Sequence, residues 1–131
     1  MMRSMVLISA LAVATATSAL ARPGKGYEQI APGAYAIVAE VRAKPGKEAE
    51  LRAATLPLIA LVRSDPKNLV YFLQEDRASP GRFIFYEVFA TLEDFEAHND
   101  MPYVKAFLAR MPELSDGGVK VTRLAILAAP R

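Results

Sequence analysis

Two short runs of large apolar residues constrain the fold of this chain more than any other feature: Leu69–Glu75 and Phe83–Phe89. Both are rich in aromatic and β-branched residues, which are typical of strands. Between them lies Ala78-Ser79-Pro80-Gly81, a segment of turn-forming residues. The pattern therefore predicts a β-hairpin with its turn at residues 78–81.

The segment before this hairpin predicts a strand followed by a helix. Tyr35–Ala43 carries apolar side chains on one alternation and ends at Lys44-Pro45-Gly46, so we expect a strand. Lys47–Arg63 has its apolar residues at helical spacing, which predicts a helix. Pro57 lies inside this helix and should kink or break it, because proline lacks the backbone N–H that a helix needs.

The segment after the hairpin predicts a helix in two pieces and a last strand. Thr91-Leu92-Glu93-Asp94 is a variant of the capping box that opens helices. Asp100-Met101-Pro102 should restart a helix, whose apolar face would include Met111. Asp116-Gly117-Gly118 is expected to form a turn before a strand at Val119–Leu127.

The predicted order of elements is β-α-β-β-α-β. This order indicates an α+β, ferredoxin-like fold, with a four-stranded antiparallel sheet and helices packed on one of its faces. The fold would occupy residues 35–131 as one domain, and the Gly/Pro-rich residues 22–34 would form an N-terminal arm.

Both faces of the hairpin strands are apolar, which predicts a homodimer. Phe83, Phe85 and Phe89 point one way, whereas Ile84, Tyr86 and Val88 point the other. The helices can cover only one face, and a large exposed apolar face marks an interface or a ligand groove. We expect two sheets to face each other in a dimeric α+β barrel. The alternative is that the arm folds over the open face.

The first 21 residues predict a secretory signal peptide. Arg3 supplies the positive charge, Met5–Ala16 the apolar region, and Ala19-Leu20-Ala21 the cleavage site. We expect cleavage after Ala21 and an exported protein, periplasmic or secreted, with no stable membrane anchor. A membrane anchor is the alternative, but the apolar stretch is short and diluted by serine and threonine.

The composition excludes several kinds of site. The chain has no cysteine and one histidine, so disulfides, thiolate metal sites, cysteine nucleophiles and multi-histidine metal sites within one chain are excluded. The net charge is +2, without a run of basic residues, so we expect no nucleic-acid binding.

Glu87 and His98 are the two candidates for chemistry. Glu87 lies on the same strand face as Phe85 and Phe89, so burial should make it a proton-handling group. The alternatives are a salt bridge to an arginine, either Arg42, Arg82 or Arg123, or a position at the edge of the sheet that reaches water. His98 has an ordinary pKa near neutrality and would serve as a base in a cavity or, alternatively, contact the last carbonyls of its helix.

Aromatic side chains could line a cavity around these two groups, although aromatic residues often form plain core. The candidates are Tyr71, Tyr86, Phe89, Phe95 and Tyr103, with the polar Asn99 beside His98.

The run Phe83–Phe89, followed by Thr91–Phe95, Glu96-Ala97-His98 and Met101–Phe107, resembles the antibiotic biosynthesis monooxygenase (ABM) family, in particular its quinol monooxygenase type. Members typically show a strand ending in Y-E-x-W, then a helix with a histidine and a following P-H/Y-x-x-x-F. Lys44-Pro45-Gly46-Lys47 and the Asp65-Pro66 segment also fit the family pattern. The resemblance covers about residues 35–111.

This resemblance implies a dimeric α+β barrel that oxygenates quinols or phenols with O₂, without metal or flavin as cofactor. A deprotonated phenol or quinol can pass an electron to O₂ itself, so the protein supplies a dry aromatic pocket and a proton acceptor. Carried over to this sequence, Glu87 and His98 are catalytic, and substrate-binding residues follow: Tyr71, Phe89, Phe95, Asn99 and Tyr103.

The sequence also departs from the family pattern. Phe89 stands where tryptophan is usual, and Tyr103 stands where a second histidine is common. These losses motivate an alternative function, a non-enzymatic small-molecule-binding or interaction module of the same dimeric fold. Haem binding or degradation is a third interpretation, supported by His98 with Asn99 but not by a tryptophan.

Overall fold

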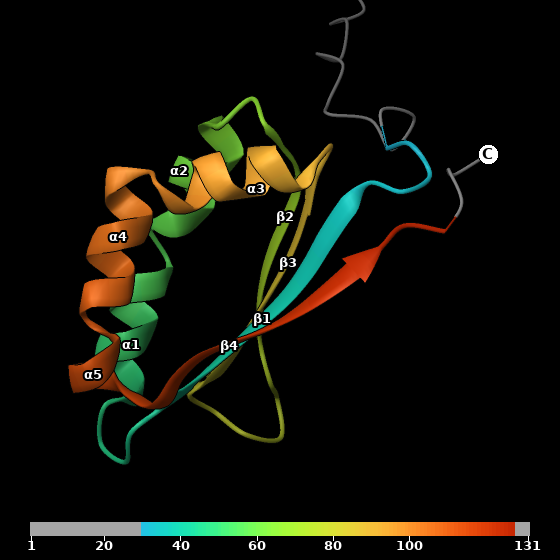
Figure 1. The fold of residues 1–131 in the computed structure, drawn as a ribbon. Helices are drawn as coiled ribbons and strands as arrows, with labels where there is room; N and C mark the ends of the chain where they lie inside the picture. Colours follow the sequence, from blue (N-terminus) through green and yellow to red (C-terminus); the bar gives the residue numbers. More distant parts are fainter. Residues whose placement is uncertain (1–29, 128–131) are drawn as a thin grey trace, which may run out of the picture.

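A computed structural model describes residues 30–127 of the chain (Figure 1). Its elements follow the predicted order, with both helical segments divided into shorter helices. They are β1 (Tyr35–Ala43), α1 (Glu48–Thr55), α2 (Leu58–Ser64), β2 (Asn68–Glu75), β3 (Arg82–Phe89), α3 (Leu92–Asn99), α4 (Pro102–Ala109), α5 (Met111–Leu114) and β4 (Ser115–Ala125).

The four strands form one antiparallel sheet in the order β2-β3-β1-β4. All the helices lie on the same side of this sheet (Figure 1). The α+β, ferredoxin-like fold predicted from the sequence is therefore confirmed. The predicted signal peptide at residues 1–21 lies outside the described residues, as does the arm up to residue 29. Between residues 30 and 127, no helix is long and apolar enough to span a membrane.

The helix boundaries follow the local signals in the sequence. The predicted break at Pro57 is confirmed, because α1 ends at Thr55 and α2 begins at Leu58. Thr91 caps α3, as predicted, with its side-chain oxygen accepting a hydrogen bond of 3.1 Å from the backbone N–H of Asp94. Pro102 lies in the first turn of α4, where its missing N–H costs nothing.

The prediction for the last strand was wrong at its start. Residues 116–118 do not form a turn before the strand; β4 begins at Ser115 and includes them. Val119 pairs with Val41 and Ser115 pairs with Ala43, so β4 has extra residues in a bulge at this point. Gly117 and Gly118 make the bulge possible, because both adopt a positive φ that other residues rarely tolerate. Met111 starts the separate helix α5 and does not extend α4.

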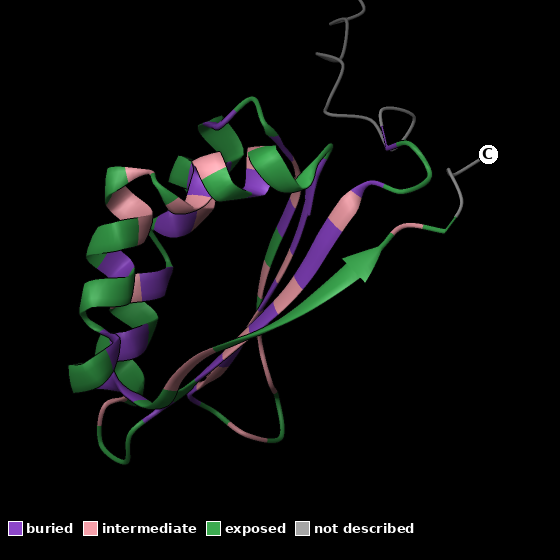
Figure 2. Cartoon of the chain, in the orientation of Figure 1, coloured by how far each residue is buried: buried purple, intermediate pink, exposed green. Residues whose placement is uncertain are grey.

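Side-chain parity places the core between the helices and the sheet. Phe83, Phe85 and Phe89 of β3 are buried beneath the helices. Figure 2 shows the same alternation along β1, where buried and half-buried residues follow each other. On the opposite face, Phe72 is 42% exposed and Tyr86 is half-buried. This second apolar face is the surface for which the sequence predicts a partner.

The described part of the arm covers one end of this open face. Ile30 and Ala34 are buried against Ala36 of β1 and Val88 of β3. Ile126, just after β4, packs against the same small cluster. The alternative in which the arm covers the open face therefore holds at one end, while Phe72 remains exposed elsewhere on that face.

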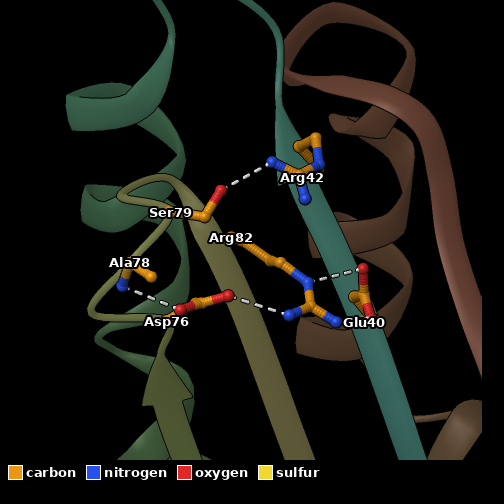
Figure 3. Close-up of polar contacts among 6 residues, drawn as sticks. All are labelled: Glu40, Arg42, Asp76, Ala78, Ser79 and Arg82. Carbon is orange, nitrogen blue, oxygen red and sulfur yellow. Dashed lines mark hydrogen bonds and ion pairs between the residues drawn. The ribbon is translucent and has the colours of Figure 1, made fainter.

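The other end of the open face carries a network of charges (Figure 3). Arg82 donates hydrogen bonds to both carboxylate oxygens of Glu40, at 2.8 and 2.6 Å, and to Asp76 at 2.8 Å. Arg42 donates to Ser79 in the hairpin turn at 2.8 Å. These contacts hold the turn of the β2–β3 hairpin against β1, because a bidentate arginine–carboxylate pair fixes both strands.

Candidate active site

A cavity of about 410 Å³ lies between the helices and the sheet. Most of its wall is apolar, and its polar groups come from β2, β3, α3 and β4. The lining residues from the sheet are Ile37, Ala39, Tyr71, Phe85, Glu87, Val119, Val121 and Arg123. Those from the helices are Leu58, Val62, Phe95, His98, Asn99, Val104, Phe107 and Leu108.

Glu87 lies in the middle of β3 and is 7% exposed. It faces the cavity because the alternation that buries Phe85 and Phe89 also directs the position between them toward the helices. Burial raises the pKa of Glu87 to about 7, since the charged form loses its hydration. The carboxyl group is therefore protonated in a substantial fraction of molecules at neutral pH.

None of the predicted arginine partners binds Glu87 in the described structure. Arg82 is engaged by Glu40 and Asp76, and Arg42 donates to Ser79 on the other face of the sheet. Arg123 lines the same cavity without an ion pair to Glu87. The carboxylate instead contacts His98, with 3.5 Å between Oε2 of Glu87 and Nε2 of the imidazole.

His98 lies in the last turn of α3 and is 4% exposed. Its imidazole points into the molecule between two carboxyl groups, which differs from the alternative of a contact with the last carbonyls of its helix. Burial lowers the pKa of His98, and the nearby Asp65 opposes this effect by favouring the charged form. Because burial dominates, the imidazole is largely neutral at neutral pH and can accept a proton.

Asp65, which was not among the predicted site residues although the Asp65-Pro66 segment fits the family pattern, forms the third member of this group. It follows α2, is buried, and accepts a hydrogen bond of 2.9 Å from the backbone N–H of Lys67 through Oδ1. Its Oδ2 lies 3.6 Å from Nδ1 of His98. Both distances are longer than the usual N–H···O hydrogen bond of about 2.7–3.2 Å, so these are close contacts between the imidazole and two carboxyl groups. His98 lies between Asp65 and Glu87, so the three side chains form a row from the loop after α2 to the cavity.

The structure divides four of the predicted aromatic residues into two layers and places the fifth, Tyr86, on the open face of the sheet, away from the cavity. Tyr71 and Phe95 line the cavity, as does the polar Asn99. Phe89 and Tyr103 do not line it. They pack against the imidazole of His98, with ring centroids 5.1 and 6.0 Å away.

The tyrosine hydroxyl groups near the cavity share two features. Burial raises the pKa of both Tyr71 and Tyr103, so both remain protonated at neutral pH. Among residues 30–127, neither hydroxyl has a hydrogen-bond partner. Each can therefore donate to, or accept from, a molecule that reaches it.

The arrangement suits proton transfer in a water-poor space. A neutral imidazole with Nδ1 toward Asp65 presents Nε2 toward Glu87 and the cavity, where it can accept a proton. The described residues contain no group of three or more histidine, cysteine or acidic side chains arranged to hold a metal ion.

Comparison with known proteins identifies the family. The family model for antibiotic biosynthesis monooxygenase matches residues 34–110. The crystal structure of PA3566 from Pseudomonas aeruginosa is similar, with a TM-score of 0.69 and 25% identity over 73% of this chain and 96% of that one. A candidate antibiotic biosynthesis monooxygenase from Caulobacter crescentus has a TM-score of 0.66 and 27% identity over 76% of this chain and 94% of that one.

A curated relative also matches. An uncharacterized protein of Synechocystis is 26% identical over 91 residues, which cover 68% of this chain and 62% of the relative. The chain thus spans less than two thirds of the length of that protein. The match of the family model covers more than half of this chain and includes Glu87, His98 and Asp65. This chain belongs to the antibiotic biosynthesis monooxygenase family.

Proposed function

We propose that this protein is an exported monooxygenase that oxidises a quinol or phenolic molecule with O₂. One observation carries the proposal: a buried imidazole and a buried carboxyl group, 3.5 Å apart, face an apolar cavity of about 410 Å³. Such a cavity is large enough for a small aromatic molecule. Family membership supports the same reaction class, and the two arguments are independent because the first rests on geometry alone.

The reaction needs a proton acceptor and exclusion of water. His98 would take a proton from the substrate hydroxyl, and the resulting anion, rich in electrons, would reduce O₂. One oxygen atom would enter the ring and the other would leave as water, so that a quinol and O₂ give a hydroxyquinone and water. The electrons come from the substrate itself. The apolar wall around Phe85 and Phe95 keeps the anion from being hydrated, which preserves its reactivity.

Glu87 and Asp65 would assist His98 in different ways. Glu87, with its pKa near 7, can exchange a proton with Nε2 and return it to the departing oxygen. Asp65 would hold the proton of the neutral imidazole on Nδ1, which leaves Nε2 free to act as the base.

The experiment measures O₂ uptake by the purified protein with menadiol and related quinols, corrected for autoxidation. Isotope-labelled O₂ and mass spectrometry of the product establish whether oxygen is incorporated. We expect His98→Ala to lower the rate by about 10²–10⁴-fold, the usual contribution of a general base. Glu96→Gln, on the exposed side of the same helix, is the matched control and should retain the rate.

A quinol panel on which the wild type and His98→Ala do not differ would refute the proposal. Binding of aromatic molecules without any turnover would favour the alternative function as a binding module of the same fold.

The assembly that we propose is a homodimer through the open face of the sheet. Phe72 and Leu124 are each more than 40% exposed there, next to the half-buried Tyr86. At the far end of this face, Glu40 and Asp76 are already paired with Arg82 within the chain, so these carboxylates would need no partner from a second copy.

A further inference from the structure

The cavity has a second polar end, formed by Arg123 of β4. Arg123 pairs with Ile37 of β1, and Ile37 pairs with Glu87 of β3. The three residues therefore form one row across the sheet, and all three line the cavity. Since neighbouring strands lie about 4.8 Å apart, the Cα atoms of Glu87 and Arg123 are separated by roughly 10 Å.

Arg123 has a charge that the described part of the chain leaves unpaired. No ion pair within residues 30–127 includes it, and it is the one cation among the residues that line the cavity. By contrast, Arg82 on the opposite face is held by two carboxylates. Arg123 is exposed, and so is the neighbouring Val121, which places the guanidinium group at the open side of the cavity.

The surface between the two polar ends is apolar. Ile37 and Ala39 form its floor on β1, and Val121 continues it on β4. A flat aromatic ring can lie on this floor. A guanidinium group beside the ring then favours an anion at that end, because its planar array of donors matches a carboxylate in two parallel hydrogen bonds.

The opposite end excludes the same anion. Asp65 and Glu87 place two acidic groups against His98, and they disfavour a ligand carboxylate at that end, where the described lining residues offer no lysine or arginine to bind it. A ligand with one anionic group is thereby oriented, with its charged end at β4 and its other end near His98.

We propose that the cavity binds an aromatic hydroxy acid, with its carboxylate on Arg123 and its hydroxyl near Glu87 and His98. The placement of the hydroxyl near His98 rests on the proposed function, whereas the placement of the carboxylate depends only on Arg123. The substrate class is therefore a phenolic or quinol carboxylic acid, and the roughly 10 Å between the Cα atoms of Glu87 and Arg123 favours one of about two fused rings.

The experiment compares the binding of two probes by titration calorimetry. One is a hydroxynaphthoate with its hydroxyl and carboxylate on opposite rings, and the other is the matching naphthol. We expect the wild type to bind the acid about tenfold more tightly than the naphthol, the effect of one charge-assisted contact. Arg123→Gln should abolish this preference while leaving naphthol binding intact, and Arg123→Lys should retain part of it.

Lys120→Gln is the matched control, because Lys120 lies on the same strand, is exposed and points to the other face. It should keep the preference for the acid. Raising the salt concentration should reduce the preference in the wild type and have no effect in Arg123→Gln. Circular dichroism of each variant verifies that the fold is retained.

Three results would overturn the inference: an equal affinity of the wild type for acid and naphthol, a preference that survives in Arg123→Gln, or no binding of either probe. Failure of the proposed function is distinguishable from these. A preference that depends on Arg123 without O₂ uptake would refute the monooxygenase and uphold the anion site, whereas oxidation of neutral quinols without the preference would do the reverse.

Discussion

Replacing Glu87 by glutamine tests whether this buried carboxyl group makes the stability of the protein depend on pH. Burial raises its pKa from the ordinary 4.5 to about 7 in the folded protein. Above pH 4.5 the unfolded chain releases this proton while the folded chain retains it, so rising pH favours unfolding. The contribution of Glu87 to stability is therefore fully present below about pH 4.5 and is lost as the pH rises through about 7.

The interval between the two pKa values corresponds to about 3 kcal/mol, at about 1.4 kcal/mol for each pH unit. Urea unfolding at a fixed protein concentration, repeated between about pH 4.5 and 8, gives the free energy of unfolding of the wild type and of Glu87→Gln. We expect the wild type to lose up to about 3 kcal/mol relative to the variant over this range.

Two controls make this comparison specific. His98 has a lowered pKa, so its contribution has the opposite sign: it is present above about pH 6.5 and lost as the pH falls. The wild type and Glu87→Gln both contain His98, so subtracting their free energies of unfolding removes most of the contribution of His98. Glu96→Gln, an exposed acid on α3, should show no comparable dependence on pH. A constant difference between the wild type and Glu87→Gln at all pH values would refute the reasoning.

Three further predictions concern the histidine, the assembly and the cap of α3. Asp65→Asn removes a negative charge beside His98, so NMR titration of the imidazole should show a still lower pKa; an unchanged titration would contradict the contact. Sedimentation equilibrium at micromolar concentration should give twice the monomer mass for the wild type and the monomer mass for Phe72→Glu; a monomeric wild type would refute the proposed dimer. Thr91→Ala should lower the free energy of unfolding by about 1 kcal/mol, because the N–H of Asp94 loses its acceptor, whereas Thr91→Ser should not; urea unfolding with no loss in Thr91→Ala would show that the cap contributes nothing.

Local patterns in the sequence determined the elements and their order. The alternation in Phe83–Phe89 made this segment a strand and placed Glu87 on the face of Phe85, because side chains alternate with a period of two in any strand. Pro57 divides the helix because proline lacks the backbone N–H that a continuous helix needs. These effects act within a few residues and do not depend on the rest of the fold.

The tertiary structure decided which of the two strand faces lies beneath the helices, since parity is symmetric until another layer packs against the sheet. It also decided the start of β4, because the two glycines of residues 117–118 can form either a turn or a bulge, and only the pairing with β1 selects the bulge.

The candidate site shows the same division. The sequence identified Glu87 and His98 through unusual residue types in apolar surroundings, but it did not reveal that Asp65 contacts His98 or that Arg123 lines the same cavity without pairing with Glu87. Asp65 reaches His98 from a loop after α2, and Arg123 joins the cavity through its pairing with Ile37. Such contacts join residues that are far apart along the chain, so they arise only when the helices and the sheet close around one space.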